Sequence, residues 1–252
     1  MSSLDLIAAL ALPDSALVDR RVPKTLLVEN SAPTAADRRR IREDIEEIRW
    51  FAALKPTTVG VAEYRDAARE YLEIAVLQLS LRIETSSNRL TELVHRAVPY
   101  PVLLIRRQKD GMELSLAHKR WSQGESGKTV LDGGVVATGM INDHANGIIT
   151  AFCDSLTLPR QPYGSLLVLY QGWIDSVQAL RAAKVTGFYT IPETRAKVED
   201  RASALQEYGR LESRISELSA AGTREKQIPR LAAINLELKR LRADRDAVRT
   251  RL

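Results

Sequence analysis

Residues 97–121, AVPYPVLLIRRQKDGMELSLAHKRW, constrain the fold more strongly than any other stretch of the chain. Two prolines near its start favour an extended approach, because proline disfavours the α-helical region for the residue before it. Residues 102–107 are apolar in both alternating positions until they reach two arginines, which predicts a central strand leaving a core. Asp110-Gly111 favours a tight turn, and residues 112–117 then alternate between larger apolar residues and polar or small ones. The stretch therefore predicts a β-hairpin whose second strand is half-buried.

The second strand of this hairpin runs into His118-Lys119-Arg120-Trp121, where a histidine, two cations and a tryptophan adjoin. Cations at a hairpin end can hold nucleic acid by contacts to phosphates that do not depend on base sequence. A solvated hairpin end explains the same residues equally well. The candidate nucleic-acid-binding residues are Arg106, Arg107, Lys119, Arg120 and Trp121.

Four further segments complete the predicted body of the protein. Residues 71–84 predict a long central strand, which needs a bulge or burial on both faces because its apolar positions change phase. Residues 35–54 carry apolar residues at three- and four-residue spacing, which predicts one amphipathic helix. Residues 25–29 predict a short strand, and residues 64–69 predict a helical turn. We expect an α+β fold with a mixed or antiparallel sheet and flanking helices.

The composition changes after Pro192 to charged residues, alanine and leucine. Apolar residues there follow alternating three- and four-residue steps, which is the pattern of a coiled-coil seam. Gly222 suits the end of a first helix and Pro229 the start of a second. We predict two domains, an α+β domain over residues 1–190 and an antiparallel coiled-coil helical hairpin over 191–252. The hairpin could also mediate homo-oligomerisation through residues 195–252.

Net charge and cysteine content limit the kinds of partner and compartment. The chain carries a net charge of +5, and residues 193–252 hold 14 Lys and Arg against 10 Asp and Glu, a surplus of +4. That basic surplus suits nucleic acid, although a solvated helix face is its commoner cause. A single cysteine, Cys153, cannot form an internal disulfide, which favours a reducing compartment. No apolar run approaches the roughly 18 residues of a membrane span, so we expect a cytoplasmic protein that does not bind membranes.

Two motifs invite over-interpretation as cofactor sites. The sequence GESGKT, residues 124–129, resembles the end of a phosphate-binding loop, but Ser122 occupies the position of the required first glycine. The residues that follow predict strand and turn instead of the helix that such a loop needs. The polar loop at 141–147, INDHANG, supplies too few ligands for a metal and is interpreted as turn chemistry. We expect neither a cofactor nor a metal.

Five stretches of the chain resemble a bacterial family of unknown function, DUF4391. They are ALVDRRVPKTLLVEN, DIEEIRWFAALKP, YLEIAVLQLSL, VPYPVLLI and LSLAHKRW. The resemblance covers roughly residues 10–190, with the helical tail as a loose extension. It implies genomic company of SNF2-type helicases and DNA methyltransferases in restriction-like or phage-defence loci. It carries over no catalytic residue.

Three functional hypotheses follow. The first is a non-enzymatic accessory subunit of a DNA-processing system, with an SNF2-type helicase or DNA methyltransferase as its partner and DNA as a further ligand. The second is a Mg²⁺-dependent nuclease, which needs clustered carboxylates and usually a lysine. Its candidate residues are Glu73, Glu84, Asp110, Glu113, His118 and Lys119, but the Asp/Glu-x-Lys triplet is missing at the expected strand. The third is a structural oligomer assembled through the helical hairpin.

Overall fold

The computed structural model describes residues 5–31, 33–82, 88–109, 111–125, 127–142 and 146–252. The chain divides into two compact units, Met1–Val177 and Gln178–Leu252, and the boundary falls inside helix α7 (Leu166–Thr186). The division into folding domains 1–190 and 191–252 stays a prediction, because compactness alone does not test independent folding. None of the described helices combines the length and apolarity needed to cross a bilayer.

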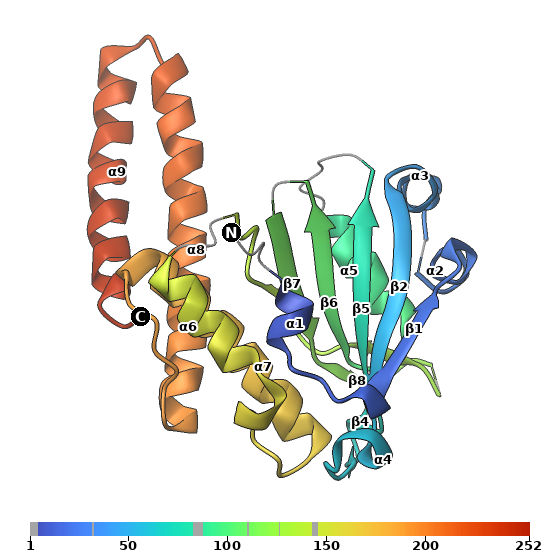
Figure 1. Cartoon of the computed structure of the whole chain (residues 1–252). Coiled ribbons are helices and arrows are strands. Elements are labelled where there is room, and N and C mark those ends of the chain that lie inside the picture. The colour runs from blue at the N-terminus through green and yellow to red at the C-terminus, as the bar shows by residue number, and fades with distance from the viewer. Residues whose placement is uncertain (1–4, 32, 83–87, 110, 126, 143–145) are drawn as a thin grey trace. The chain divides into compact units, whose positions relative to one another are not determined.

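A six-stranded sheet forms the centre of the first unit, in the order β1-β2-β5-β6-β7-β10 (Figure 1). Its strands are β1 (Leu17–Arg21), β2 (Ile45–Leu54), β5 (Ile74–Leu81), β6 (Val102–Gln108), β7 (Gly111–Ala117) and β10 (Val136–Ala137). Strands β5 and β6 are parallel and are joined by helix α5 (Asn88–Ala97), whereas the other neighbouring strands pair antiparallel. This mixed sheet with flanking helices confirms the predicted α+β class.

Shorter elements surround the sheet. Two ribbons pair β3 (Tyr64–Arg65) with β4 (Glu70–Tyr71) and β8 (Lys119–Trp121) with β9 (Thr129–Leu131). The remaining helical segments are α1 (Leu6–Ala9), η1 (Asp14–Ala16), α2 (Lys24–Ser31), α3 (Ala35–Glu43), α4 (Pro56–Val59), α6 (Gly147–Leu156) and η2 (Leu158–Arg160). Helices α2, α3 and α5 share one core cluster with β2, β5 and β6. They therefore cover one face of the sheet.

Strand β2 corrects the single helix predicted for residues 35–54, because α3 ends at Glu43 and a strand begins at Ile45. The pairing of β2 with β5 shifts register between Ile45 and Glu47, and again between Trp50 and Ala52. Each shift inserts one extra residue into β2, so Ile45 and Ile48 both reach the same core cluster despite their three-residue spacing. The two bulges gave a strand the apolar spacing of a helix.

Two smaller predictions are also wrong. Residues 25–29 belong to helix α2, which begins directly after Pro23, whose fixed φ suits entry into a helix. Only Leu27 is buried among the residues of α2. The short apolar run that predicted a strand here is therefore mostly not part of the core. The helical turn predicted for residues 64–69 is instead the β3–β4 ribbon. The long strand predicted over residues 71–84 is confirmed as β5, buried on both faces over most of its length, and the bulges lie in its partner.

The predicted hairpin is confirmed as β6 and β7, with Gln108 opposite Gly111. Two details differ. Strand β7 is buried on both faces from Met112 to Ala117, so it is not half-buried. Gly111 serves close packing, because a Cβ there would lie 2.5 Å from the Ile141 carbonyl oxygen and would also collide with Asn142. Asp110, the other turn residue, lies outside the described residues.

The second unit contains the predicted helical hairpin, built from α8 (Arg195–Arg224) and α9 (Ile228–Arg249). Ile215 and Leu218 of α8 pack on Leu238 of α9, and an ion pair of 3.1 Å joins Arg245 to a helix α8 glutamate. Pro229 lies in the first turn of α9, as predicted. Gly222 lies inside α8, not beyond its end, where a Cβ would meet Ile234 at 3.3 Å. Its role is to let the two helices approach closely.

The substitution Gly111→Ala should lower the free energy of unfolding by about 1–3 kcal/mol, because the added Cβ must displace backbone. Gly134→Ala is the matched control, since a Cβ there meets nothing within 4 Å and its φ is not positive. Urea denaturation of both variants checks this. Equal stability of the two would contradict the close approach at Gly111.

Candidate functional site

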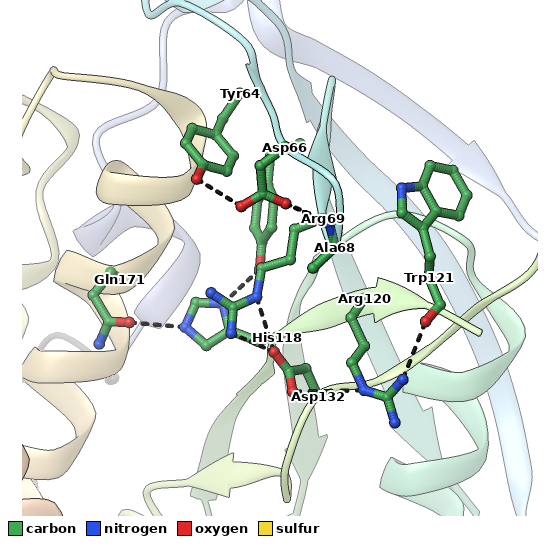
Figure 2. Close-up of polar contacts among 10 residues, drawn as sticks. Tyr64, Asp66, Ala68, Arg69, His118, Arg120, Trp121, Asp132 and Gln171 are labelled. Carbon is green, nitrogen blue, oxygen red and sulfur yellow. Dashed lines mark hydrogen bonds and ion pairs between the residues drawn. The ribbon is translucent and has the colours of Figure 1, made fainter. Parts of the chain in front are cut away.

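The end of the predicted hairpin forms a polar network around His118 (Figure 2). The Tyr71 hydroxyl at the end of β4 lies 2.5 Å from His118 Nδ1, and His118 Nε2 lies 2.8 Å from Gln171 Oε1 on α7. Gln171 Nε2 donates to Asp175 Oδ1 at 2.7 Å, which orients the amide so that its oxygen faces the imidazole. An amide oxygen only accepts, so in neutral His118 Nε2 carries the hydrogen and Nδ1 accepts from Tyr71.

This geometry commits both ring nitrogens of His118 to the protein itself. Burial raises the pKa of Tyr71 well above its ordinary value, so the phenol remains a neutral donor to the imidazole. A general base needs a nitrogen within reach of the substrate proton. As arranged, His118 therefore fastens β4 to α7, and the structure does not support the catalytic role considered for it.

Asp132, directly after β9, forms the second centre of the network. Its Oδ2 accepts from Arg69 Nε at 2.9 Å and Nη2 at 2.5 Å, and Arg120 Nε lies 3.8 Å from Oδ1. Hydrogen bonding to Asp132 raises the pKa of Arg69. Arg120 also donates to the Trp121 carbonyl oxygen at 3.1 Å. Both Arg120 and Trp121 are partly buried, and the Trp121 backbone amide joins the two ribbons by donating to the Ala68 carbonyl oxygen at 2.8 Å.

A third residue of the network region, Asp66, fixes the turn between β3 and β4. Its carboxylate accepts from the Tyr64 hydroxyl at 2.7 Å and from the backbone amides of Ala68 and Arg69 at 2.7 and 2.6 Å. The hydroxyl and then these amides lower the pKa of Asp66, because they stabilise its charged form. Arg69 connects the two carboxylates, because its backbone amide donates to Asp66 and its guanidinium to Asp132 (Figure 2). The network is thus a structural link between two ribbons.

Lys119 is buried, a position that does not favour the phosphate contact predicted for it. Only 1% of its surface is exposed, and its Nζ donates to the carbonyl oxygens of His95 and Val98, the latter at 2.7 Å. These carbonyls lie at the end of α5, where a helix leaves acceptors unsatisfied and favours positive charge. Burial, and then the charge of Arg96, lowers the pKa of Lys119 to about 8. Lys119 therefore caps a helix from inside the core, and it is not free to activate a nuclease water.

His95 lies fully buried beside this cap. Its Nε2 is 3.0 Å from the Ser115 hydroxyl, and burial followed by the Lys119 charge lowers its pKa to about 3. The imidazole is accordingly neutral in the folded protein. Because the unfolded chain takes up a proton on this residue near pH 6.5, its contribution to stability is lost as the pH falls from 6.5 toward 3.

Arg106 and Glu113 correct two further predictions. They pair with each other across β6 and β7, and Arg106 is 3% exposed. Arg106 therefore does not face a phosphate, and Glu113 is neutralised by an internal cation. A buried pair of this kind is costly to break, because removing one partner leaves a buried charge.

The candidate carboxylates of a nuclease do not converge in the described structure. Glu73 precedes β5 and forms an ion pair with Lys55 at 3.0 Å. Glu113 of β7 lies opposite Arg106 of β6, which in turn lies opposite Leu79 of β5. Six residues of strand separate these levels, about 20 Å at 3.3 Å per residue. Glu84 and Asp110 lie outside the described residues. Within the described ranges, no three His, Cys, Asp or Glu side chains are grouped closely enough to hold a metal ion.

Arg107 is the one predicted nucleic-acid residue that is well exposed, and it belongs to a different cluster. It lies opposite Ser80 in the parallel pair of β5 and β6, two residues before Arg82. Lys24 at the start of α2 donates to the carbonyl oxygens of Arg42 and Ile45. Burial, then the charges of Arg82 and Arg21, lowers the pKa of Lys24, while Glu46 opposes the shift. We call Arg21, Lys24, Arg82 and Arg107 the basic end of the sheet.

Of the basic end, only Arg107 was among the predicted nucleic-acid-binding residues, although Arg21 and Lys24 lie close together in the sequence. The missing link was Arg82, whose place next to them follows from the parallel register of β5 and β6. The segment GESGKT, in contrast, connects β8 to β9 as expected from its glycines, and Lys128 within it forms an ion pair with Glu125. A strand begins at Thr129, where a phosphate-binding loop would need a helix.

The substitution Tyr71→Phe should lower the free energy of unfolding by about 1–3 kcal/mol, because it leaves a buried acceptor on His118 without its donor. Tyr64→Phe removes an exposed hydroxyl bonded to Asp66 and should change stability by less than about 0.5 kcal/mol. Chemical denaturation of the two variants checks this. Equal effects would remove the special role of the Tyr71 and His118 pair.

Replacing Lys119 by Met should change how stability depends on pH. Between pH 8 and 10.5 the folded protein releases the Lys119 proton while the unfolded chain keeps it, so wild-type stability should rise relative to Lys119→Met. The relative gain from pH 8 to pH 10 is about 2 kcal/mol at 1.36 kcal/mol per pH unit. Urea denaturation at both pH values measures it. Parallel pH profiles would show that Lys119 titrates normally.

Comparison with known proteins places the chain in a family. Searches against curated proteins and against solved structures gave no significant match. A family model described as a domain of unknown function, DUF4391, matches residues 10–244. The match continues beyond residue 190 through most of α9, so the helical hairpin is part of the family pattern and not a loose extension. The chain therefore belongs to the DUF4391 family.

Proposed function

We propose that this chain is a non-enzymatic accessory subunit of a bacterial DNA-processing system, which contacts nucleic acid through the basic end of the sheet. One observation carries the proposal. Four cations gather at one end of β5 and β6, and for Arg21, Arg82 and Arg107 no carboxylate partner lies among the described residues. Burial, and then the charges of Arg82 and Arg21, lower the pKa of Lys24. Such a cluster suits the phosphate backbone, which supplies most of the sequence-independent affinity for DNA.

The non-enzymatic part of the proposal is supported by how the protein uses its reactive side chains. His118 and Lys119 satisfy internal partners, and Glu113 pairs with Arg106. A metal-dependent nuclease would instead need carboxylates gathered at one point. We therefore place the nuclease second, and the experiment below tests for it directly.

The helical hairpin supports contact with another protein. Ile228 and Leu236 of α9 are 81% and 72% exposed and lie eight residues apart, close to one face of the helix. We propose that another helix packs on this face of α9. The partner that we propose is an SNF2-type helicase or DNA methyltransferase subunit in a restriction-like or phage-defence assembly of the cytoplasm. Self-association through residues 195–252 is the alternative.

Binding to labelled duplex and single-stranded DNA should weaken steeply with salt. If four phosphates are neutralised, affinity should fall about 100-fold between about 50 and about 200 mM salt. The double variant Arg82→Gln/Arg107→Gln should bind more weakly and show a smaller salt slope. Fluorescence anisotropy measures both quantities.

The matched control is Arg65→Gln/Arg160→Gln, which removes the same charge from exposed positions elsewhere in the first unit and should bind like the wild type. Equal loss of DNA affinity in both double variants would show that binding depends on the net charge of the protein and not on the basic end. Absence of binding at low salt would refute the DNA contact. Shortened strands recovered after incubation with Mg²⁺ would favour the nuclease instead.

A further inference from the structure

A small apolar pocket of about 320 Å³ includes Arg21 of the basic end among its lining residues. It is lined by residues of α2, by residues of β2 and β5 on the sheet face that α2 packs against, and by the segment from α5 into β6. Ile48 and Trp50 of β2, with Leu77 of β5, form its floor, and Tyr100 stands at its edge. Its size falls at the lower end of the range for small-molecule sites.

Aromatic rings give this pocket a defined shape. The Trp50 indole Nε1 donates to the Ala52 carbonyl oxygen at 2.9 Å, which holds the ring in place. Tyr100 is 41% exposed and Leu26 is 47% exposed, so large apolar surface remains open to solvent at the pocket. Two prolines restrict the backbone around Tyr100, which keeps this wall ordered without a bound partner.

Positive charge borders the same pocket. Arg20 lies directly opposite Trp50 in the antiparallel pair of β1 and β2, and directly opposed residues point to the same face of a sheet. Arg21 lines the pocket too and belongs to the basic end. No carboxylate side chain is among the described residues that line it. The pocket thus combines a flat apolar interior with a cationic mouth.

These features select one kind of occupant. A nucleobase is flat and stacks on aromatic side chains, while the phosphate attached to it needs a cation. Bases inside a duplex are stacked on one another and cannot enter such a pocket, whereas unpaired bases can be splayed out. An acidic peptide would satisfy the arginines but leaves the planar aromatic interior without a specific match.

We propose that this pocket takes one unpaired nucleobase of a single strand, whose phosphate contacts Arg20 and Arg21. The inference rests on the proposed function and names the nucleic acid that it left open. The basic end then guides the neighbouring phosphates, so the chain prefers single-stranded to duplex DNA. Such a strand is what a helicase partner exposes.

The test uses the full chain with a labelled single-stranded oligonucleotide, the same sequence as a duplex, and free nucleoside monophosphate. Tyr100→Ala should weaken single-strand binding about 5- to 150-fold, the effect of losing one stacked base, and leave duplex binding within about twofold. Arg20→Gln should weaken it in the same direction. Tyr163→Ala, which removes a tyrosine that is 48% exposed outside the pocket, is the matched control.

Tryptophan fluorescence gives a second readout. The oligonucleotide should quench the wild-type protein more than Trp50→Phe, because stacking reaches that indole. Single-strand binding that is unchanged in Tyr100→Ala and Arg20→Gln would overturn the pocket while leaving the DNA contact of the basic end intact. If neither strand binds at all, the proposed function fails together with the inference. If the free nucleotide or an acidic peptide quenches the fluorescence but the oligonucleotide does not, the pocket binds that ligand. The proposal that it takes a base of a single strand would then be wrong.

Discussion

The central strands β5, β6 and β7 are buried on both faces for most of their length, and the rest of the structure follows from that constraint. A polar group in such a strand, or at its end, must find its partner inside the protein. Arg106 forms an ion pair with Glu113 on the neighbouring strand, and Lys119 donates hydrogen bonds to the carbonyl oxygens at the end of α5. The charged side chains of the hairpin therefore hold β6, β7 and α5 together.

The function that we propose accordingly lies at the boundary of the sheet. At the basic end, β5 and β6 run out of the core in parallel, so Arg82 and Arg107 reach solvent near one another and near Lys24. The apolar pocket is lined by Trp50, which is partly buried, and by Tyr100, which is 41% exposed. Arg20 and Arg21 line the same pocket as Trp50 and Tyr100, and cations beside aromatic side chains are the combination that proteins use to bind single strands.

Much of the fold could be predicted because it is local. The hairpin, the long strand β5, helix α5 and the helical pair all carry their own periodicity. Strand β2 could not be recognised, because its two bulges shift the side-chain phase. The pairing of Arg106 with Glu113 was accessible in principle, since a two-residue loop between Gln108 and Gly111 places them opposite one another. Nothing local marks Lys119 as buried, because its partners are backbone carbonyls of a distant helix.

One measurement tests the central claim, that the hairpin cations are structural and the basic end is the contact surface. Arginine modification of the native protein, read by mass spectrometry with and without single-stranded DNA, reports each guanidinium separately. The account predicts that Arg20, Arg21, Arg82 and Arg107 react in the free protein and are protected by DNA, while Arg106 reacts in neither state. Modification of Arg106 in the native protein, or protection confined to Arg120, would contradict it.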